Sequence, residues 1–514
     1  MKAVSGTQMR GLDRRTITET GISGERLMKI AGLRAAAGIL ENFAADIPGE
    51  AAPKFCILAG KGNNGGDAFV VAEMLANADY SVSLHCAAPG SDLSGDALTM
   101  FRHLPASVRD HISGTLTEQD LADPLTVIVD GLLGTGFHGR LREPYRAWCR
   151  LVNASGKPVA ALDIPSGLDA DSGEADPDAV TADITFTMAA PKTGMFSEAG
   201  IRHTGRLRVM DIGIPESFVN ELPDTVECTD FSTVKGKLKR EAFDAHKYSR
   251  GHLFIAGGCK FYPGAPLLAS EAGLRSGAGL VTCCLPEHAE IHANIPKALI
   301  VRRLTSETGF FTARSASELL AMSGKAGAFA VGPGMGTAIE CVGFLEKMLG
   351  VPAPLLLDAD ALNLLAANSG LIEKLRGRKN ITVMTPHPGE MKRLASALKL
   401  DSETMSRPEL TAAAAARLNA YIVCKGPRTV VAAPDGRYAV NLSGCPALAT
   451  AGTGDILSGM IGAFLLNTAL DPFEAIRTAV FLHGCTAEIT APLGSRGYIA
   501  DDFLPMIGKA ISRI

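Results

Sequence analysis

The sequence has few aromatic residues, no Cys-x-x-Cys pair and no long apolar run. Aromatic residues make up 5% of the 514 positions. The 11 cysteines are scattered, some of them within apolar segments such as KFCILAG, which favours buried reduced thiols over disulfides or zinc ligands. The longest apolar stretch, 459–466, is far shorter than the roughly 20 residues that span a bilayer. Because the first segment, MKAVSGTQMRGLDRR, also has no apolar signal core, we expect a cytoplasmic protein.

Charge of either sign is in little excess, with a formal net charge of −4. This balance argues against a nucleic acid or an acidic membrane as the main partner and leaves small molecules. The 55 glycines cluster in short loops, which indicates tight turns and close approaches of the backbone to ligands. We also expect a homo-oligomer.

Strand and helix patterns alternate along both halves of the chain. Unbroken apolar runs such as PKFCILAG and GHLFIAGG alternate with helical patterns, the first of which covers 7–46, and this predicts parallel sheets covered on both faces. The length exceeds the roughly 250–300 residues at which one core stops growing. A polar, proline-containing segment at 214–234 separates the halves, so we predict domains at 1–222 and 223–514. The fold class is α/β, with a Rossmann-like three-layer sandwich first and a second α/β domain after it.

Three polar loops follow strands of the first half: NNGGD (63–67), DGLLGTGFHGR (130–140) and DIPSG (163–167). Because loops after parallel strands meet at one rim, we expect these three to line a single site. Glycine-rich loops at helix starts favour phosphate. Simple turns with helix capping by the asparagines or the aspartate of the first loop remain the alternative.

Polar side chains of these loops suggest two kinds of chemistry. Asn64, Asp130 and Ser166 offer hard oxygen ligands to a cation. Asp163 would lie next to a ligand rather than in bulk water, which suits a general acid or base.

The first half resembles the NAD(P)H-hydrate epimerase family over residues 5–218, in the runs GKGNNGGDAFVVA, VDGLLGTGFHGRLREPY and ALDIPSGLDADSG. The resemblance implies a potassium ion on Asn64, Asp130 and Ser166, and contact of Asp163 with the reacting ring. The implied substrate-binding residues are Asn63, Asn64, Gly65, Gly66, Asp67, Gly134, Thr135, Gly136, Phe137, His138, Gly139, Arg140 and Asp163. The chain departs from the family at 28–31, where Met-Lys-Ile-Ala stands in place of a Met-Glu-Asn-Ala-like run.

In the second half, ALATAGTGDILSG (447–459) places small residues before Asp455 at the start of an apolar helix. The amides of 451–454 and the helix dipole would form an anion hole, where Asp455 deprotonates a hydroxyl facing a phosphoryl group. Simple N-capping by Asp455 is the alternative. Asp358 and Asp360, after another strand, are either metal or substrate contacts or helix caps.

Two further turns follow strands of the second half. CKGPRTVVA is a strand–turn–strand pattern in which Lys425 and Thr429 suit nucleotide phosphate and base edges. In TPHPGEMKRL, two prolines stiffen a turn that presents His387, and Glu390 occupies a capping position of the next helix.

A strand rim with a GTGD anion hole resembles the ribokinase-like fold. The motifs HKYSRGHLFIAGG, YPGAPLLAS, RSGAGLV, GPGMG, LDADALN, PHPGEM, CKGPRTVV and ATAGTGD occur in the order of the ADP-dependent NAD(P)H-hydrate dehydratase family, over 235–510. The implied ADP-binding residues are Lys425, Gly426, Pro427, Arg428, Thr429, Ala447, Ala449, Thr450, Ala451, Gly452, Thr453 and Gly454. The implied hydrate-binding residues are Ala265, Gly334, His387, Pro388, Gly389, Glu390, Met391, Lys392, Arg393 and Asp455. Ala451 departs from the glycine that many relatives carry.

The two resemblances imply one substrate, NADH or NADPH hydrated at the ring C5–C6 bond. The first domain would interconvert the R and S epimers at C6, and the second would dehydrate the S form with ADP, giving AMP and phosphate. Magnesium is expected by analogy with phosphoryl transfer. The alternative is a ribokinase-like kinase of small alcohols with a non-catalytic, nucleotide-binding first domain.

Overall fold

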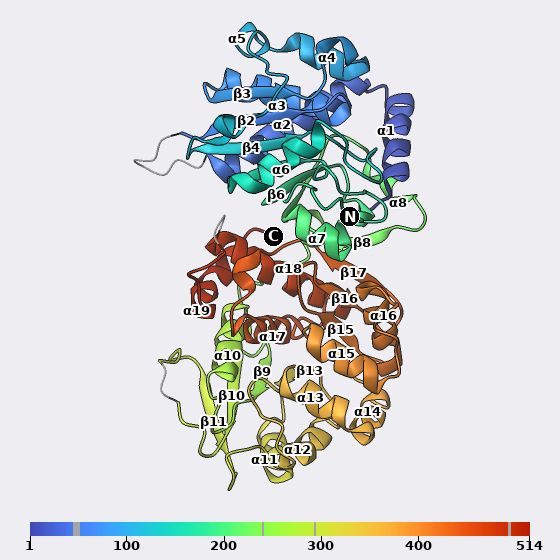
Figure 1. Ribbon diagram of the computed structural model, residues 1–514. Coiled ribbons are helices and arrows are strands. Elements are labelled where there is room, and N and C mark those ends of the chain that lie inside the picture. Colours follow the sequence, from blue (N-terminus) through green and yellow to red (C-terminus); the bar gives the residue numbers. More distant parts are fainter. Residues whose placement is uncertain (45–51, 239–240, 292–293, 492–494) are drawn as a thin grey trace. The chain divides into compact units, whose positions relative to one another are not determined.

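The computed structural model describes residues 1–44, 52–238, 241–291, 294–491 and 495–514 (Figure 1). The chain forms two compact units, Met1–Glu227 and Cys228–Ile514. The sequence-based boundary lies between 222 and 223, slightly before this division. Within the described ranges, no helix is both long enough and apolar enough to cross a bilayer.

The first unit is a three-layer sandwich around a six-stranded, fully parallel sheet. Its strands, in sheet order, are β3 (Ser81–Cys86), β2 (Lys54–Ala59), β4 (Thr126–Gly131), β5 (Val159–Leu162), β6 (Ile184–Met188) and β7 (Arg206–Met210). Side chains alternate between the two faces of a strand. Phe55 and Ile57 therefore join one apolar core, whereas Cys56 and Leu58 join another that includes Trp148 of helix α6 (Tyr145–Ser155).

The helices of this unit cover both faces of the sheet. They are α1 (Gly6–Thr20), α2 (Gly24–Phe43), α3 (Asn63–Asn77), α4 (Gly95–His103), α5 (Ala106–Arg109), α6 (Tyr145–Ser155), α7 (Glu198–Thr204) and α8 (Glu216–Asn220). The single helix expected over 7–46 is two helices, because Gly21 ends α1 in a left-handed conformation (φ +75°) and the Ser23 hydroxyl caps α2. Residues 45 and 46 lie outside the described part of the chain.

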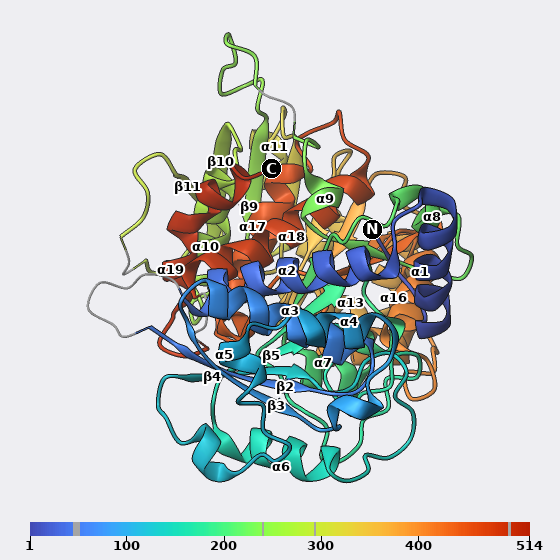
Figure 2. The ribbon, with the colours of Figure 1, turned by 90° about the horizontal axis from the view of Figure 1, so that it is seen from above.

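Helices α2 and α3 run side by side with very close backbones (Figure 2). A methyl group on Gly32 would overlap Val70, and one on Gly66 would overlap the Met28 sulfur. A methyl group on Gly32 would also lie 2.9 Å from the Asp67 carbonyl oxygen of the α3 backbone, so this contact fixes where α3 begins, next to the loop that follows β2.

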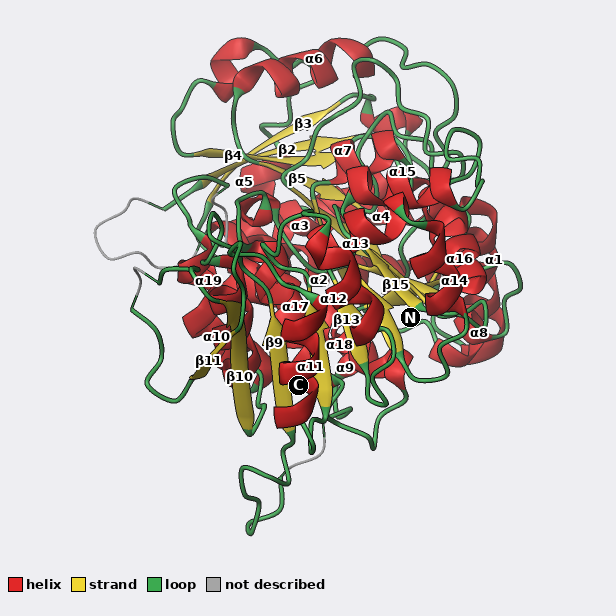
Figure 3. Ribbon diagram, turned by 90° about the horizontal axis from the view of Figure 1, so that it is seen from below, coloured by secondary structure: helices red, strands yellow, loops and turns green. Residues whose placement is uncertain are grey.

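The second unit contains a mixed sheet with helices along its strands (Figure 3). In sheet order its strands are β8 (Val226–Thr229, of which the last two residues belong to this unit), β17 (Tyr438–Asn441), β16 (Val430–Ala432), β15 (Tyr421–Cys424), β14 (Thr382–Met384), β13 (Leu355–Leu357), β12 (Ala328–Val331), β9 (His252–Ala256), β10 (Leu280–Pro286) and β11 (Ile300–Leu304), and β8 runs parallel to β17. In this sheet order, every neighbouring pair from β15 through β14, β13, β12, β9 and β10 to β11 is parallel, as the sequence predicts. Strands β15, β16 and β17 are antiparallel, because tight turns rather than helices connect them.

An apolar core on one face of this sheet includes Leu267, Met460 and Ile461, which belong to α10 and α17. The longer helices of the unit are α10 (Ala265–Arg275), α11 (Ala313–Met322), α12 (Glu340–Met348), α13 (Asp360–Ala367), α14 (Ser369–Arg376), α15 (Pro388–Ala397), α16 (Arg407–Leu418), α17 (Thr453–Phe464) and α18 (Pro472–Thr490). The shorter ones are α9 (Phe231–Val234), α19 (Ala500–Phe503) and α20 (Ile507–Ile511). Helix α17, which carries Asp455, thus packs its apolar side on the sheet.

Candidate active sites

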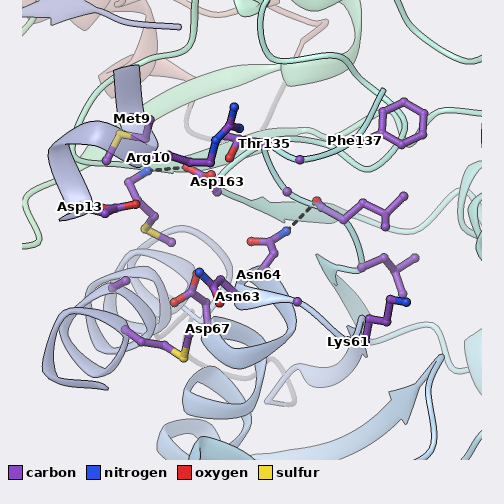
Figure 4. A pocket seen from close by; sticks show the side chains of 18 of the residues that line it. Met9, Arg10, Asp13, Lys61, Asn63, Asn64, Asp67, Thr135, Phe137 and Asp163 are labelled. Carbon is purple, nitrogen blue, oxygen red and sulfur yellow. Dashed lines mark hydrogen bonds between the residues drawn. The ribbon is translucent and has the colours of Figure 1, made fainter. Parts of the chain in front are cut away.

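A cavity of about 710 Å³ in the first unit brings together the loops that follow β2, β4 and β5 (Figure 4). Its lining includes these residues expected from the sequence: Asn63, Asn64, Asp67, Gly134, Thr135, Gly136, Phe137, His138, Arg140 and Asp163. The three loops meet because parallel strands end at the same edge of the sheet.

Asp163 is held in place by a buried lysine. Its Oδ1 atom pairs with the ammonium group of Lys192 and accepts hydrogen bonds from the Met188 amide (3.1 Å) and the Thr187 hydroxyl (3.4 Å). The Lys192 side chain is fully buried, whereas that of Asp163 is 15% exposed. The carboxylate is therefore anchored through one oxygen and remains accessible from the cavity.

Asn64, Asp130 and Ser166, expected as cation ligands, form a connected buried cluster. The Ser166 hydroxyl donates to Asp130 Oδ1 (2.6 Å), and the Ser166 amide donates to Asp130 Oδ2 (2.8 Å). Asn64 Nδ2 donates to the carbonyl oxygen of Leu133 (2.8 Å), and the backbone amide of Leu133 donates to the Ser166 hydroxyl (2.9 Å). The Asn64 Oδ1 atom is buried and has no hydrogen-bond partner. A buried oxygen without a donor next to a carboxylate fits a hard cation.

Three of the glycines expected to bind substrate, Gly65, Gly66 and Gly139, are not among the residues that line the cavity. Packing or a turn explains each of them, and their contact with substrate stays a prediction. A methyl group on Gly65 would overlap the Gly60 carbonyl oxygen, so this glycine allows the loop to pass over the start of α3. Gly139 adopts a left-handed backbone (φ +79°) at a turn.

Asp13 of α1, which no sequence motif singled out, also lines the cavity. Burial, and secondly the charge of Asp163, raise its pKa to about 6. The pKa of Asp67 is raised well above its ordinary value, first by burial and then by Asp163 and Asp13. One signal was available: Asp13 follows Met9 and Leu12 on the buried side of α1, where a carboxylate is unusual.

In the second unit, the loop before Asp455 ends in a partly exposed helix terminus. Gly452, with φ +92°, precedes the first residue of α17, and the Thr453 hydroxyl donates to the carbonyls of Leu448 (2.9 Å) and Thr450 (3.0 Å). The first amides of a helix have no acceptor within it, so this terminus suits a phosphate. Ala451 is exposed and has no left-handed backbone, so its methyl group is accommodated.

A charged cluster adjoins this terminus. Lys425 Nζ lies 2.8 Å from Asp358 Oδ1, and the Ser458 hydroxyl donates to Asp358 Oδ2 (2.6 Å). Burial, followed by the charge of Asp358, raises the pKa of Asp455 to about 7, although Lys425 opposes this. Asp358 thus orients Lys425, and both of its oxygens are engaged. Among the described residues, no group of three or more His, Cys, Asp and Glu side chains is arranged to hold a metal ion.

His387 forms the N-cap of α15. Its Nδ1 accepts the Gly389 amide (3.0 Å), while its own amide donates to Glu390 Oε2 (2.8 Å). Burial, and then Lys425 and Arg393, lower the pKa of His387. A methyl group on Gly334, where φ is +63°, would lie 3.3 Å from the Ala265 Cβ atom, so these two expected substrate contacts are neighbours.

Some residues expected at the second site do not present their side chains to a ligand. Met391, Ala447 and Arg428 are buried at 2%, 3% and 7% exposure, so only their backbones can contribute. Lys392 is exposed but pairs with Glu403 (3.1 Å). These positions lie within motifs, but a motif does not show which way each side chain points: Met391 faces inward from α15, and Arg428 is turned inward by a turn with φ +54°.

Comparison with known proteins finds a matching family model for each of the two units. The family model of the YjeF-related protein N-terminus matches residues 24–194, and the model of the NAD(P)H-hydrate dehydratase matches 253–507. A Salinibacter ruber protein named as a bifunctional NAD(P)H-hydrate repair enzyme is 36% identical, covering 98% of this chain and 94% of its own length. A Moorella thermoacetica protein of the same name is 34% identical over 99% and 96% of the two chains.

The chain belongs to the family of bifunctional NAD(P)H-hydrate repair enzymes. Among solved structures, a Bacillus subtilis ADP/ATP-dependent NAD(P)H-hydrate dehydratase crystallised with ATP and Mg²⁺ is 27% identical, with a TM-score of 0.47, and covers 56% of this chain and 98% of that one. Family membership confirms the relationship that both sets of sequence motifs indicated. It does not favour the small-alcohol kinase alternative.

Proposed function

We propose that this repair-family member restores hydrated NADH and NADPH in two steps, one in each unit. The observation that carries the proposal is the pair of carboxylates, Asp163 and Asp455, each at the rim of its own sheet within a full-length match to repair enzymes. The first unit interconverts the epimers of the hydrate, and the second removes water from the S epimer with ADP.

In the first unit, Asp163 moves the proton of the C6 hydroxyl. Opening of the C6–N1 bond gives an aldehyde, and closure on its other face inverts C6. Asp163 is suited to this step because Lys192 anchors one oxygen while the cavity reaches the side chain. Asn64, Asp130 and Ser166 would hold a potassium ion, which supplies fixed positive charge at the site when bound; the unpartnered Asn64 oxygen supports this assignment.

In the second unit, Asp455 takes the proton of the C6 hydroxyl. The hydroxyl oxygen of the hydrate then attacks the β-phosphorus of ADP, and AMP leaves. Elimination of phosphate, with loss of the C5 proton, then restores the dihydropyridine ring. The first amides of α17 and the ammonium group of Lys425 stabilise charge on the transferred group. Magnesium would be held mainly by the phosphate oxygens of the nucleotide, and it would neutralise part of their charge when bound.

The test combines the purified full chain, ADP and a mixture of R and S NADH hydrate, followed by the recovery of nicotinamide absorbance. Complete recovery supports both activities. Recovery that stops when the S epimer is exhausted leaves only the dehydratase, and a stable phosphorylated product would instead support the kinase alternative.

We further propose that the protein works in the cytoplasm as a homo-oligomer, which sedimentation and fractionation test.

A further inference from the structure

Three acidic side chains that line the cavity of the first unit interact with one buried lysine. Asp13 comes from α1, Asp67 from α3 and Asp163 from the loop after β5, and all three line the same cavity (Figure 4). Lys192 pairs directly with Asp163 alone. One of the other two carboxyl groups can therefore serve as a proton donor, since like charges this close disfavour joint ionisation.

We propose that Asp13 is a second catalytic residue of the epimerase and acts as the acid that pairs with Asp163 as the base. This inference rests on the epimerase activity proposed above. Epimerisation by ring opening requires two proton transfers at different atoms, and one anchored carboxylate does not account for both.

The proton balance assigns the two roles. On opening, Asp163 takes the proton from the C6 hydroxyl, the C6–N1 bond breaks, a C6=O bond forms, and Asp13 gives its proton to N1. After rotation about C5–C6, N1 attacks the opposite face of the aldehyde. The N1 proton then returns to Asp13, and Asp163 returns its proton to the C6 oxygen, so both groups regain their starting states.

Asp13 is better placed than Asp67 for the acid role. Asp67 is only 8% exposed and lies at the close contact between α2 and α3, whereas Asp13 is half-buried at the cavity wall. The raised pKa of Asp13, about 6, keeps a protonated fraction near neutral pH. Asp13 interacts with Asp67, Asp163 and Lys192. The other charged side chains that line the cavity are Arg10 of the same helix and Lys61, Asp96, Arg140 and Arg142.

The test is Asp13→Asn in the full chain, compared with Glu19→Gln, an exposed carboxylate on the same helix that pairs with Arg15. We expect conversion of the R epimer to fall by about 100-fold or more in Asp13→Asn and to be unchanged in Glu19→Gln. Dehydration of the S epimer by the second unit should be unaffected in both variants. Asp13→Glu, which keeps a transferable proton, should recover part of the lost rate.

Two outcomes would overturn the assignment. One is an Asp13→Asn protein with wild-type epimerisation, and the other is a wild-type kcat/KM for epimerisation that does not decline as pH rises above about 6. The pH profile needs no variant, so it decides the question even where a substitution impairs folding. A wild-type protein that never consumes the R epimer refutes the epimerase function itself, which is a distinguishable result.

Discussion

The Lys425 ammonium group lies 2.8 Å from Asp358 Oδ1, and Asp358 is almost completely buried at 1% exposure. Burial alone would raise the pKa of Asp358, but the charge of Lys425 and the hydroxyl of Ser458 lower it, so the carboxylate stays ionised. The pair thus presents an oriented cation beside the start of α17. Removing either charge leaves the other buried without a partner.

We therefore expect Asp358→Asn to lower the free energy of unfolding of the second unit by about 3 kcal/mol and to raise the KM for ADP. The matched control is Asp435→Asn, which breaks the exposed pair with Arg437 and should cost less than about 1 kcal/mol. Urea unfolding and dehydratase kinetics measure both quantities. Equal effects of the two substitutions would contradict the role given to this pair.

The raised pKa of Asp455 predicts how the dehydratase responds to pH. A base must be ionised, so kcat should rise as pH increases through about 7 and level off above it. Asp455→Asn should lose about 100-fold or more of kcat at pH 8 and leave epimerisation of the R hydrate unchanged. A pH-independent wild-type kcat between pH 5 and 8 would show that another group limits the rate.

The unpartnered Asn64 oxygen predicts a dependence of the epimerase on potassium. Replacing K⁺ by tetramethylammonium should slow epimerisation without affecting dehydration. Asn64→Ala should weaken activation by K⁺ about tenfold or more, whereas Asn77→Ala, at the exposed end of the same helix, should not. The measurement is the epimerisation rate against K⁺ concentration. Identical K⁺ curves for Asn64→Ala and wild type would remove the ion from this site.

Gly454 and Ala451 offer a comparison within one loop. A methyl group at Gly454 would lie 3.3 Å from Lys425 Nζ, so the lysine must shift away from the helix terminus. We expect Gly454→Ala to raise the KM for ADP about tenfold, equivalent to about 1.4 kcal/mol, with little loss of stability. Ala451→Gly should change KM little, because Ala451 is exposed. The reverse order of effects would mean that the methyl group of Ala451 contacts the nucleotide.

The structural features that could be predicted from the sequence lie within continuous segments of the chain. The loops after β2, β4 and β5, and the helix start before Asp455, could be recognised because a strand, its glycine-rich turn and the next helix are adjacent along the chain. Family motifs then added residue roles that spacing alone left open.

The features that sequence reasoning missed depend on packing between distant segments. Asp13 is an acidic residue in a helix, which ordinarily faces solvent, and only the folded unit shows it near Asp163 and Lys192. Lys192 was missed for the same reason, since complete burial of a lysine cannot be inferred without its partner. Conversely, the small size of Gly65 and Gly66 suggested contact with a ligand, because the motif alone does not show that Gly65 lies against the Gly60 carbonyl oxygen and that Gly66 lies against Met28 of α2.

Asp163 has a left-handed backbone, with φ +59°. For a residue with a side chain this conformation costs about 1–2 kcal/mol, and glycine would avoid the cost. Glycine would, however, leave the fully buried ammonium group of Lys192 without its partner, which costs about 3–5 kcal/mol and outweighs the relief of the backbone. Asp163→Gly should therefore melt at a lower temperature than the wild type, so a selection for heat resistance alone should retain this aspartate, and with it the group that epimerisation needs.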